Sequence, residues 1–306
     1  MKEPFVWILI LNYNKWQDTI ECINSIKKTT YKNYRILIVD NASQNNSLAI
    51  LNKELSDIEI VGIKENTGYT GGNNCGIKII MKRKADYILI LNNDTIVEKD
   101  FLWPLVNCME INKNAGAACG TILTEHNRKE IWYASGKIIK WRGLATHTNK
   151  GKEFELSKYA QVQCSKTGFI TGCMMLLRTS FLPEIGLLNE EMFLYLDDIE
   201  YSIRIKSKGY ELFYVPQSII YHKVLGEKES AFKLYYSVRN RFLLIRVAFK
   251  GINKIIASIY FTAVILYKLF IWRFSNRKFY YAAKIGFIDY LKKNFYKGKG
   301  EMFFKS

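Results

Sequence analysis

The chain has 306 residues, of which 49% are hydrophobic, and a formal net charge of +17. This length and apolar content suffice for a sizeable folded core, and they exclude an intrinsically disordered chain. The six cysteines show no paired C-x-x-C spacing. We therefore expect free thiols, no structural zinc site and a reducing compartment.

The positive charge is concentrated at the C-terminal end. Residues 232–306 contain sixteen Lys or Arg and two acids, a local +14, which leaves +3 for the first 231 residues. Nucleic acid is one partner for so basic a segment, but no nucleic-acid-binding motif accompanies the charge. The segment is also rich in aromatic and aliphatic residues, so we expect basic amphipathic helices on an anionic membrane surface and no nucleic acid.

Strands and helices alternate over the first 91 residues. The apolar run at 5–12 is too short for an export signal and lacks a cleavage site, so we expect a first strand and a protein that stays inside the cell. The pattern then predicts helices at 16–28, 47–55 and 71–84 and further strands at 34–40, 58–63 and 87–91. This alternation predicts an α/β domain with a mostly parallel central sheet flanked by helices.

Polar residues gather where these strands end, at 12–14, 40–43, 66–68 and 92–94. The ends of parallel strands lie side by side and can line one pocket. Any one of these segments could instead cap a helix or form a turn, but four together favour a ligand site.

The glycine-rich run at 68–76 matches neither a dinucleotide-binding motif nor a P-loop. Small residues at a helix start allow close approach of a nucleotide or sugar, and a plain tight turn is the alternative.

The second half of the chain is less regular. The pattern predicts a helix at 101–112, a hairpin region at 131–141 and a polar irregular segment at 143–163. It predicts a helix that begins within 190–204, a helix at 231–250, and strands at 115–124, 169–178, 211–215 and 218–222.

Three acids lie at the N-terminus of the helix predicted within 190–204: Asp197, Asp198 and Glu200. Helix capping explains one carboxylate but not three, and mutual repulsion would raise the pKa of at least one towards that of a useful general base. His222 lies at a strand end and is a candidate ligand, whereas His126 and His147 receive no function.

The segment 255–272 has eighteen residues with a single charge, Lys268. A membrane span needs about 20 apolar residues, so we expect a helix that lies on the membrane surface. A helix that spans the membrane, a packed helical extension and a homodimer face are the alternatives.

These motifs, in this order, resemble glycosyltransferase family two, and especially its bacterial rhamnosyltransferase-like branch. The resemblance covers residues 5 to 246. The matching pieces are Asn12-Tyr13-Asn14, Val39 to Ser43, Asn66 to Asn74, Leu91 to Thr95, Thr171 to Met174, Tyr195 to Glu200, His222-Lys223 and Tyr235 to Asn240. The resemblance implies a GT-A (Rossmann-like) fold and inverting transfer of a sugar from a nucleotide diphosphate.

The same resemblance assigns the donor-binding and metal-binding residues. Asp40 would contact the base or its ribose. Asn92-Asn93-Asp94 takes the place of the Asp-x-Asp motif, so Asp94 would be the main carboxylate ligand of Mg²⁺ or Mn²⁺, with His222 as a second ligand. The residues implied to bind the donor are Asn12, Asn14, Asp40, Asn41, Asn66, Gly71, Asn73, Asn92 and Asn93.

Asp198 matches the catalytic base of the family, which would take a proton from the acceptor hydroxyl. Asp197 replaces the glutamate that is common before this base. Contacts with the acceptor or the diphosphate are assigned to Asp197, Glu200, Arg239, Asn240 and Trp132, because guanidinium groups that face a pocket suit a pyrophosphate.

We therefore expect a catalytic domain at 1–228 and a membrane-associating helical extension at 229–306. The predicted enzyme is a metal-dependent inverting hexosyltransferase on the cytoplasmic face of the cell membrane, where it extends a lipid-linked surface glycan such as an O-antigen or capsule.

Two alternatives remain. A nucleotide-sugar pyrophosphorylase-like enzyme should have a Gly- and Lys/Arg-rich first strand end, which Asn12-Tyr13-Asn14-Lys15 lacks. A non-catalytic membrane scaffold would tolerate loss of Asp198.

Overall fold

The computed structural model describes residues 3–159, 161–223 and 230–298. Its strands are β1 (Val6–Asn12), β2 (Tyr34–Asp40), β3 (Glu59–Gly62), β4 (Tyr87–Asn92), β5 (Thr95–Val97), β6 (Ala115–Thr124), β7 (Ile131–Tyr133), β8 (Gly136–Ile139), β9 (Leu144–His147), β10 (Ser165–Lys166), β11 (Met174–Arg178) and β12 (Glu211–His222). Its helices are α1 (Trp16–Ile26), α2 (Ser47–Glu54), α3 (Gly68–Met81), α4 (Leu102–Ile111), α5 (Leu182–Ile185), α6 (Asp197–Ser207), α7 (Ala231–Ala248), α8 (Gly251–Ser275) and α9 (Arg277–Leu291), with short 3-10 turns η1 (Lys140–Arg142), η2 (Leu156–Tyr159), η3 (Thr179–Phe181) and η4 (Glu190–Met192).

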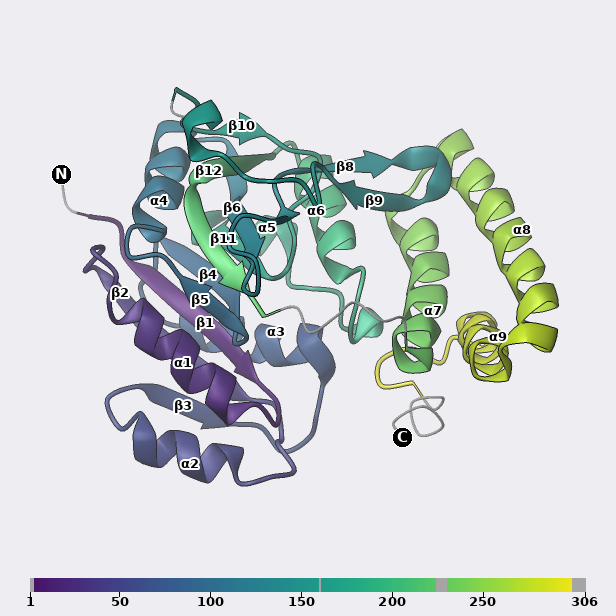
Figure 1. Ribbon diagram of the computed structural model, residues 1–306, viewed down its shortest axis with the longest axis horizontal. Coiled ribbons are helices and arrows are strands. Elements are labelled where there is room, and N and C mark those ends of the chain that lie inside the picture. The colour runs from purple at the N-terminus through teal and green to yellow at the C-terminus, as the bar shows by residue number, and fades with distance from the viewer. Residues whose placement is uncertain (1–2, 160, 224–229, 299–306) are drawn as a thin grey trace.

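The central sheet has the strand order β10-β12-β6-β11-β4-β1-β2-β3 (Figure 1). The half formed by β4, β1, β2 and β3 is parallel, as predicted. Its strands are apolar runs because helices flank the sheet and water reaches little of either face. Asn12 is opposite Asp40 and Leu11 is opposite Asn92, so the polar strand ends lie level with one another.

One antiparallel strand joins this half to the rest of the sheet. β11 pairs with β4, with Met174 opposite Leu91. The residues just before β11 therefore lie beside the end of β4, and the Asn92 N–H donates to the Cys173 carbonyl at 2.9 Å.

The segment 143–163, expected to be irregular, begins with β9, which pairs with β8 in a hairpin. Several predicted boundaries were also wrong. β11 begins at Met174 instead of residue 169, because the Ile170 N–H donates to the Ser202 hydroxyl and not to a neighbouring strand. The predicted strands at 211–215 and 218–222 are one strand, β12, whose register shifts between Val215 and Ile219 around Pro216, a residue without an N–H. α3 begins at Gly68 and not at residue 71.

The C-terminal helices α7, α8 and α9 gather at one end of the molecule, at the right of Figure 1. α7 connects two apolar clusters, since Leu243 and Leu244 belong to the main core while Phe242 and Ile245 belong to a second core with α8 and α9. The predicted domain boundary at 228/229 lies outside the described residues.

α8 is long and apolar enough to cross a membrane, with a mean hydropathy of 1.9 over an 18-residue window of which 17% is buried. One side of α8, with Ala257, Phe261 and Ile265, packs in the second core. Leu269 and Trp272 also pack against this core. On the opposite side of α8, Ile259, Phe270 and Phe274 are 67–76% exposed.

Candidate active site

A cavity of about 330 Å³ opens at the ends of β1, β2 and β4. This is where open α/β sheets bind their ligands. Its lining combines amides and one carboxylate with apolar side chains: Leu11, Tyr13, Asn41, Asn66, Gly68, Tyr69, Asn92, Asn93, Asp94, Phe193, Leu194 and Phe232. We call this cavity the donor pocket.

A buried network braces the strand ends behind the donor pocket. The Asp40 carboxylate accepts hydrogen bonds from Asn12 Nδ2 at 2.7 Å and from the N–H and hydroxyl of Ser43 at 2.9 and 2.7 Å. Asn12 Oδ1 accepts from the Thr19 hydroxyl. Asn14 fixes the adjacent turn, because its Oδ1 accepts from the Gln44 N–H at 2.7 Å. Among the predicted donor residues, Asn12, Asn14 and Asp40 thus set the shape of the pocket without lining it.

Asn41 and Asn66 hold the start of α3 against the pocket. Asn41 Nδ2 donates to Asn66 Oδ1 at 3.1 Å and to the Gly68 carbonyl at 3.0 Å. Gly68 has φ +74°, and a Cβ there would lie 2.4 Å from the Phe193 carbonyl oxygen, so only glycine fits.

Gly71 and Asn73 lie inside α3 and do not line the pocket. A Cβ at Gly71 would meet the side chain of Thr67, and Asn73 Nδ2 donates to the Tyr69 carbonyl.

Asp94 and His222 come together, as the resemblance implied. Asp94 Oδ1 lies 3.2 Å from His222 Nε2. Asp94 Oδ1 and His222 Nδ1 are both buried, and the described residues provide neither atom with a hydrogen-bond partner. Burial lowers the pKa of His222, but the Cys173 sulfur and the Asp94 carboxylate outweigh burial and raise the pKa to about 11. Asn93 Nδ2 donates to the Thr19 hydroxyl at 2.9 Å, which fixes the loop beside Asp94.

Trp132 lies on the other side of His222. The two rings meet edge to face, with centroids 4.7 Å apart, and the Trp132 ring meets His147 in the same way at 5.1 Å. Trp132 therefore borders the Asp94–His222 pair.

Asp198 lies at the start of α6 and accepts two backbone hydrogen bonds. Its Oδ2 accepts from the Gly172 N–H at 3.2 Å, and its Oδ1 accepts from its neighbour Ile199 at 2.8 Å. Burial raises the pKa of Asp198 above its ordinary value, while these N–H groups and the nearby His147 oppose the rise. A carboxylate with a raised pKa is better suited to accept a proton near neutral pH.

Tyr69 links Asp198 to the donor pocket. It lines the pocket, and its hydroxyl donates to the carbonyl of Gly172, the residue whose N–H donates to Asp198. Since Cys173 accepts from Asn92, the segment 172–173 touches both the floor of the pocket and Asp198.

The other two acids of α6 differ from each other. Asp197 is 4% exposed, and burial, followed by repulsion from Asp198, raises its pKa well above the ordinary value. Glu200 forms a bidentate ion pair with Arg204, at 3.0 and 2.7 Å. The expectation that Glu200 contacts the acceptor was therefore wrong, because both of its carboxylate oxygens bind Arg204 of the same helix.

The expectation that Arg239 and Asn240 face a diphosphate is also corrected. Both side chains are fully buried and bind backbone carbonyls. Arg239 donates to Glu191, Met192 and Tyr296, and Asn240 donates to Met192, Leu194 and Tyr195.

The loop that these two residues hold is strained. Phe193, Tyr195 and Leu196 have φ values of +61°, +68° and +65°, each in the left-handed region that non-glycine residues avoid. The loop leads directly into Asp197 and Asp198. We infer that Arg239 and Asn240 position the start of α6 from a distance.

Several residues of the site had no assignment from the sequence. Tyr69 lies in the glycine-rich run at 68–76, which was expected to approach a nucleotide or sugar, so this run was the signal that could have identified it. No sequence signal placed His147 near Asp198 or Cys173 near His222, because their contacts join segments far apart in the chain.

A comparison with protein-family models decides the family. Residues 7–186 match the glycosyl transferase family 2 model. The chain belongs to this family.

Characterised relatives agree with this assignment. The chain is 26% identical over 255 residues to the low-salt glycan biosynthesis hexosyltransferase Agl10 of Haloferax volcanii, covering 81% of this chain and 78% of that one. It is 24% identical over 257 residues to the dTDP-rhamnosyl transferase RfbF of Shigella flexneri, with 79% and 80% covered. The poly-beta-1,6-N-acetyl-D-glucosamine synthase of Staphylococcus aureus is 24% identical, and the match spans 48% of its length.

Solved structures confirm the GT-A fold. GalNAc-T7, crystallised with UDP, GalNAc and Mn²⁺, superposes with a TM-score of 0.64 at 17% identity, over 80% of this chain and 48% of that one. S. aureus TarS superposes with a TM-score of 0.54 at 14% identity, over 81% and 40%. The sequence expectations of family and fold are therefore confirmed.

Proposed function

We propose that this family 2 enzyme is a metal-dependent inverting glycosyltransferase that moves a sugar from a nucleotide diphosphate to an acceptor hydroxyl. One observation carries the proposal. The segment 172–173 contacts the floor of the donor pocket through Asn92 and the carboxylate of Asp198 through the Gly172 N–H. These contacts support a role for Asp198 as proton acceptor beside the donor pocket, whose lining of amides, one carboxylate and apolar groups suits a nucleotide sugar.

Asp94 and His222 fit a divalent cation. Asp94 supplies a buried carboxylate oxygen without a hydrogen-bond partner, and His222 supplies an imidazole 3.2 Å away. The described residues contain no cluster of three or more ligands, so diphosphate oxygens and water would complete the shell of Mg²⁺ or Mn²⁺. When bound, the cation would stabilise the negative charge of the departing diphosphate. His222 would then give up the proton that its raised pKa retains here.

In the proposed reaction Asp198 accepts the proton of the acceptor hydroxyl. The hydroxyl oxygen forms a bond to the anomeric carbon while the bond from that carbon to the diphosphate oxygen breaks. Attack opposite the leaving group inverts the anomeric centre, and no nucleophilic side chain is required. The N–H of Gly172 keeps Asp198 in place throughout.

We also propose a lipid-linked glycan acceptor, such as an O-antigen or capsule intermediate, at the cytoplasmic face of the cell membrane. The names of the relatives Agl10 and RfbF, a glycan-biosynthesis hexosyltransferase and a rhamnosyltransferase, support a glycan acceptor and a hexosyl donor. The exposed apolar side of α8, with its packed opposite side, supports a helix that lies on the membrane surface, since a spanning helix would leave the second core.

Binding and product analysis test the reaction. In a thermal-shift screen with Mn²⁺, one of UDP, dTDP or GDP should stabilise the protein, and EDTA should remove that shift. NMR of the product made with the matching sugar donor should show an anomeric configuration opposite to that of the donor. Retention of configuration, or full activity in EDTA, would contradict the mechanism. Formation of a nucleotide sugar and pyrophosphate from a sugar phosphate would favour the pyrophosphorylase alternative, and nucleotide binding without transfer would favour the scaffold.

Membrane fractionation tests the location. A protein held at the surface by its basic helices should be released by high salt, whereas retention in alkaline carbonate would show that α8 spans the bilayer. A soluble homodimer that hides α8 would contradict the membrane proposal.

A further inference from the structure

A second cavity lies on the side of the molecule that faces the C-terminal helices. Its volume is about 450 Å³, and it is formed where η1, α6 and the start of α8 meet. None of its lining residues lines the donor pocket. We call it the lysine pocket.

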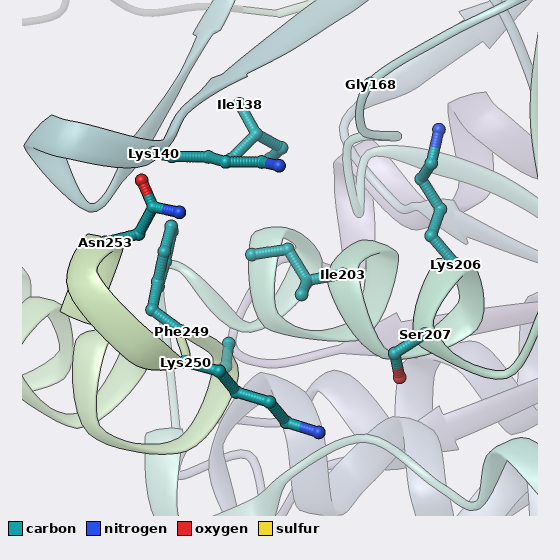
Figure 2. A pocket seen from close by; sticks show the side chains of 10 residues that line it. Ile138, Lys140, Gly168, Ile203, Lys206, Ser207, Phe249, Lys250 and Asn253 are labelled. Atoms are coloured by element: carbon teal, nitrogen blue, oxygen red, sulfur yellow. The ribbon is translucent and has the colours of Figure 1, made fainter.

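The floor of the lysine pocket is apolar and its rim is cationic. Figure 2 shows Ile203 and Phe249 between Lys140 and Asn253 on one side and Lys206 on the other, with Lys250 at the lower edge. Lys140 and Lys250 have no acidic partner among the residues that the structure describes, and Lys206 has only a 3.9 Å contact with Glu211. Glu211 lies closer to Lys166, at 2.9 Å. The rim therefore keeps a net positive charge.

This combination discriminates between ligands. A free phosphate or another small anion would gain nothing from the apolar floor, and an uncharged chain would gain nothing from the lysines. An amphiphile with one anionic group and an apolar tail satisfies both. The start of α8 adds to the preference for an anion, because Lys250 at its N-cap makes no side-chain capping bond.

The lysine pocket is continuous with the exposed side of α8. Asn253 lines the pocket in the first turn of this helix, and the neighbouring residues Ile252, Ile255 and Ile259 are 64%, 56% and 67% exposed. The tip of the β8–β9 hairpin closes the other side, where Trp141 contacts Tyr260 of α8 with ring centroids 4.9 Å apart. A lipid seated in the pocket would therefore lie level with the surface that α8 presents to a bilayer.

We propose that the lysine pocket binds the phosphate headgroup of one anionic phospholipid, with the first part of its acyl chain on Ile203 and Phe249. Together with the exposed side of α8, this site would define the face that the enzyme turns towards the membrane. The inference rests on the proposed membrane association of α8. It is independent of the sugar-transfer chemistry.

The test uses purified full-length chain and short-chain lipids below the concentration at which they form micelles. Dihexanoyl-phosphatidylglycerol should bind, and dihexanoyl-phosphatidylcholine and inorganic phosphate should bind far more weakly. The double variant Lys140→Gln/Lys250→Gln should weaken phosphatidylglycerol binding about fivefold for each lysine, or about 25-fold in total. Nucleotide binding by the same variant should be unchanged, which separates failure of this site from failure of the proposed reaction.

Lys292→Gln/Lys293→Gln is the matched control, since it removes the same charge from exposed residues after α9. It should bind phosphatidylglycerol as the unmodified protein does. Equal weakening by the two double variants would show a general effect of charge and overturn the site. Equal binding of phosphatidylcholine, or of inorganic phosphate alone, would overturn the proposed ligand.

Discussion

The donor pocket and the buried face of α7 use similar polar side chains for different purposes. Asn41 and Asn240 are both buried, and both hold a loop. At the donor pocket, however, Asp94 retains an oxygen without a hydrogen-bond partner beside the cavity. On α7, Arg239 and Asn240 direct their N–H groups to backbone carbonyls of the loop before α6.

This difference separates ligand-binding residues from positioning residues. A polar group can bind a ligand when the fold leaves it unsatisfied at a cavity, whereas a group saturated by the backbone stabilises the fold. On this basis we propose that the donor pocket holds the substrate and that α7 holds the strained loop that leads to Asp198. The predictions below test the distinction.

Apart from Asp198, the largest effect is expected from Asp94. The variant Asp94→Asn should lower turnover about 10³-fold, because it removes the charged ligand that would hold the cation against the leaving diphosphate. Steady-state rates at saturating Mn²⁺, with melting temperature as the control for folding, measure this. Turnover within about tenfold of the unmodified enzyme would contradict the assignment of Asp94 as a metal ligand.

Arg239→Met should change stability instead of ligand affinity. It leaves the carbonyls of Glu191, Met192 and Tyr296 without their donor, so we expect a loss of about 3 kcal/mol in the free energy of unfolding. Urea unfolding measures the loss. At a temperature where the variant is folded, calorimetry should give an unchanged affinity for the nucleotide. A large drop in this affinity would show that Arg239 does contact the diphosphate.

Tyr69→Phe should act on Asp198 through Gly172. Without the hydroxyl, the Gly172 carbonyl loses its partner, and we expect kcat to fall about tenfold with little change in KM for the donor. The pH–rate profile should also shift, since Gly172 donates to Asp198. An altered KM with unchanged kcat would mean that Tyr69 only shapes the pocket.

The smallest effect is expected from Asp197→Asn. Because the pKa of Asp197 is raised in the folded protein, the fold favours the protonated form, and its stabilising contribution is lost as the pH rises through that raised value. At about pH 8 the variant should melt about 2 °C or more above the unmodified protein, and the difference should shrink towards about pH 4, where the aspartate is protonated. A lower melting temperature at both pH values would show that the charge is stabilised by its surroundings.

The sequence predicted the parallel half of the sheet because each of its strands is a local apolar run and each ends in a local polar signal. The order of the motifs also led to the prediction that Asp94 and His222 are metal ligands, and the structure places these two side chains 3.2 Å apart. It could not predict the role of Arg239, whose partners lie 47 to 57 residues away along the chain. Phe193, Tyr195 and Leu196 adopt left-handed backbone conformations that normally require glycine, so their sequence gives no indication that this loop is strained. The residues that line the lysine pocket come from four separate segments of the chain, so no linear motif marks it.

Asp198 tests the central claim most directly. With saturating donor, Mn²⁺ and acceptor, Asp198→Asn should transfer sugar about 10³-fold more slowly than the unmodified enzyme, while the thermal shift produced by the nucleotide stays the same. Turnover of the unmodified enzyme should fall in acid as Asp198 gains a proton, at a pH above the range of an ordinary aspartate because burial raises its pKa. Near-normal turnover by Asp198→Asn would contradict the assignment of Asp198 as the base.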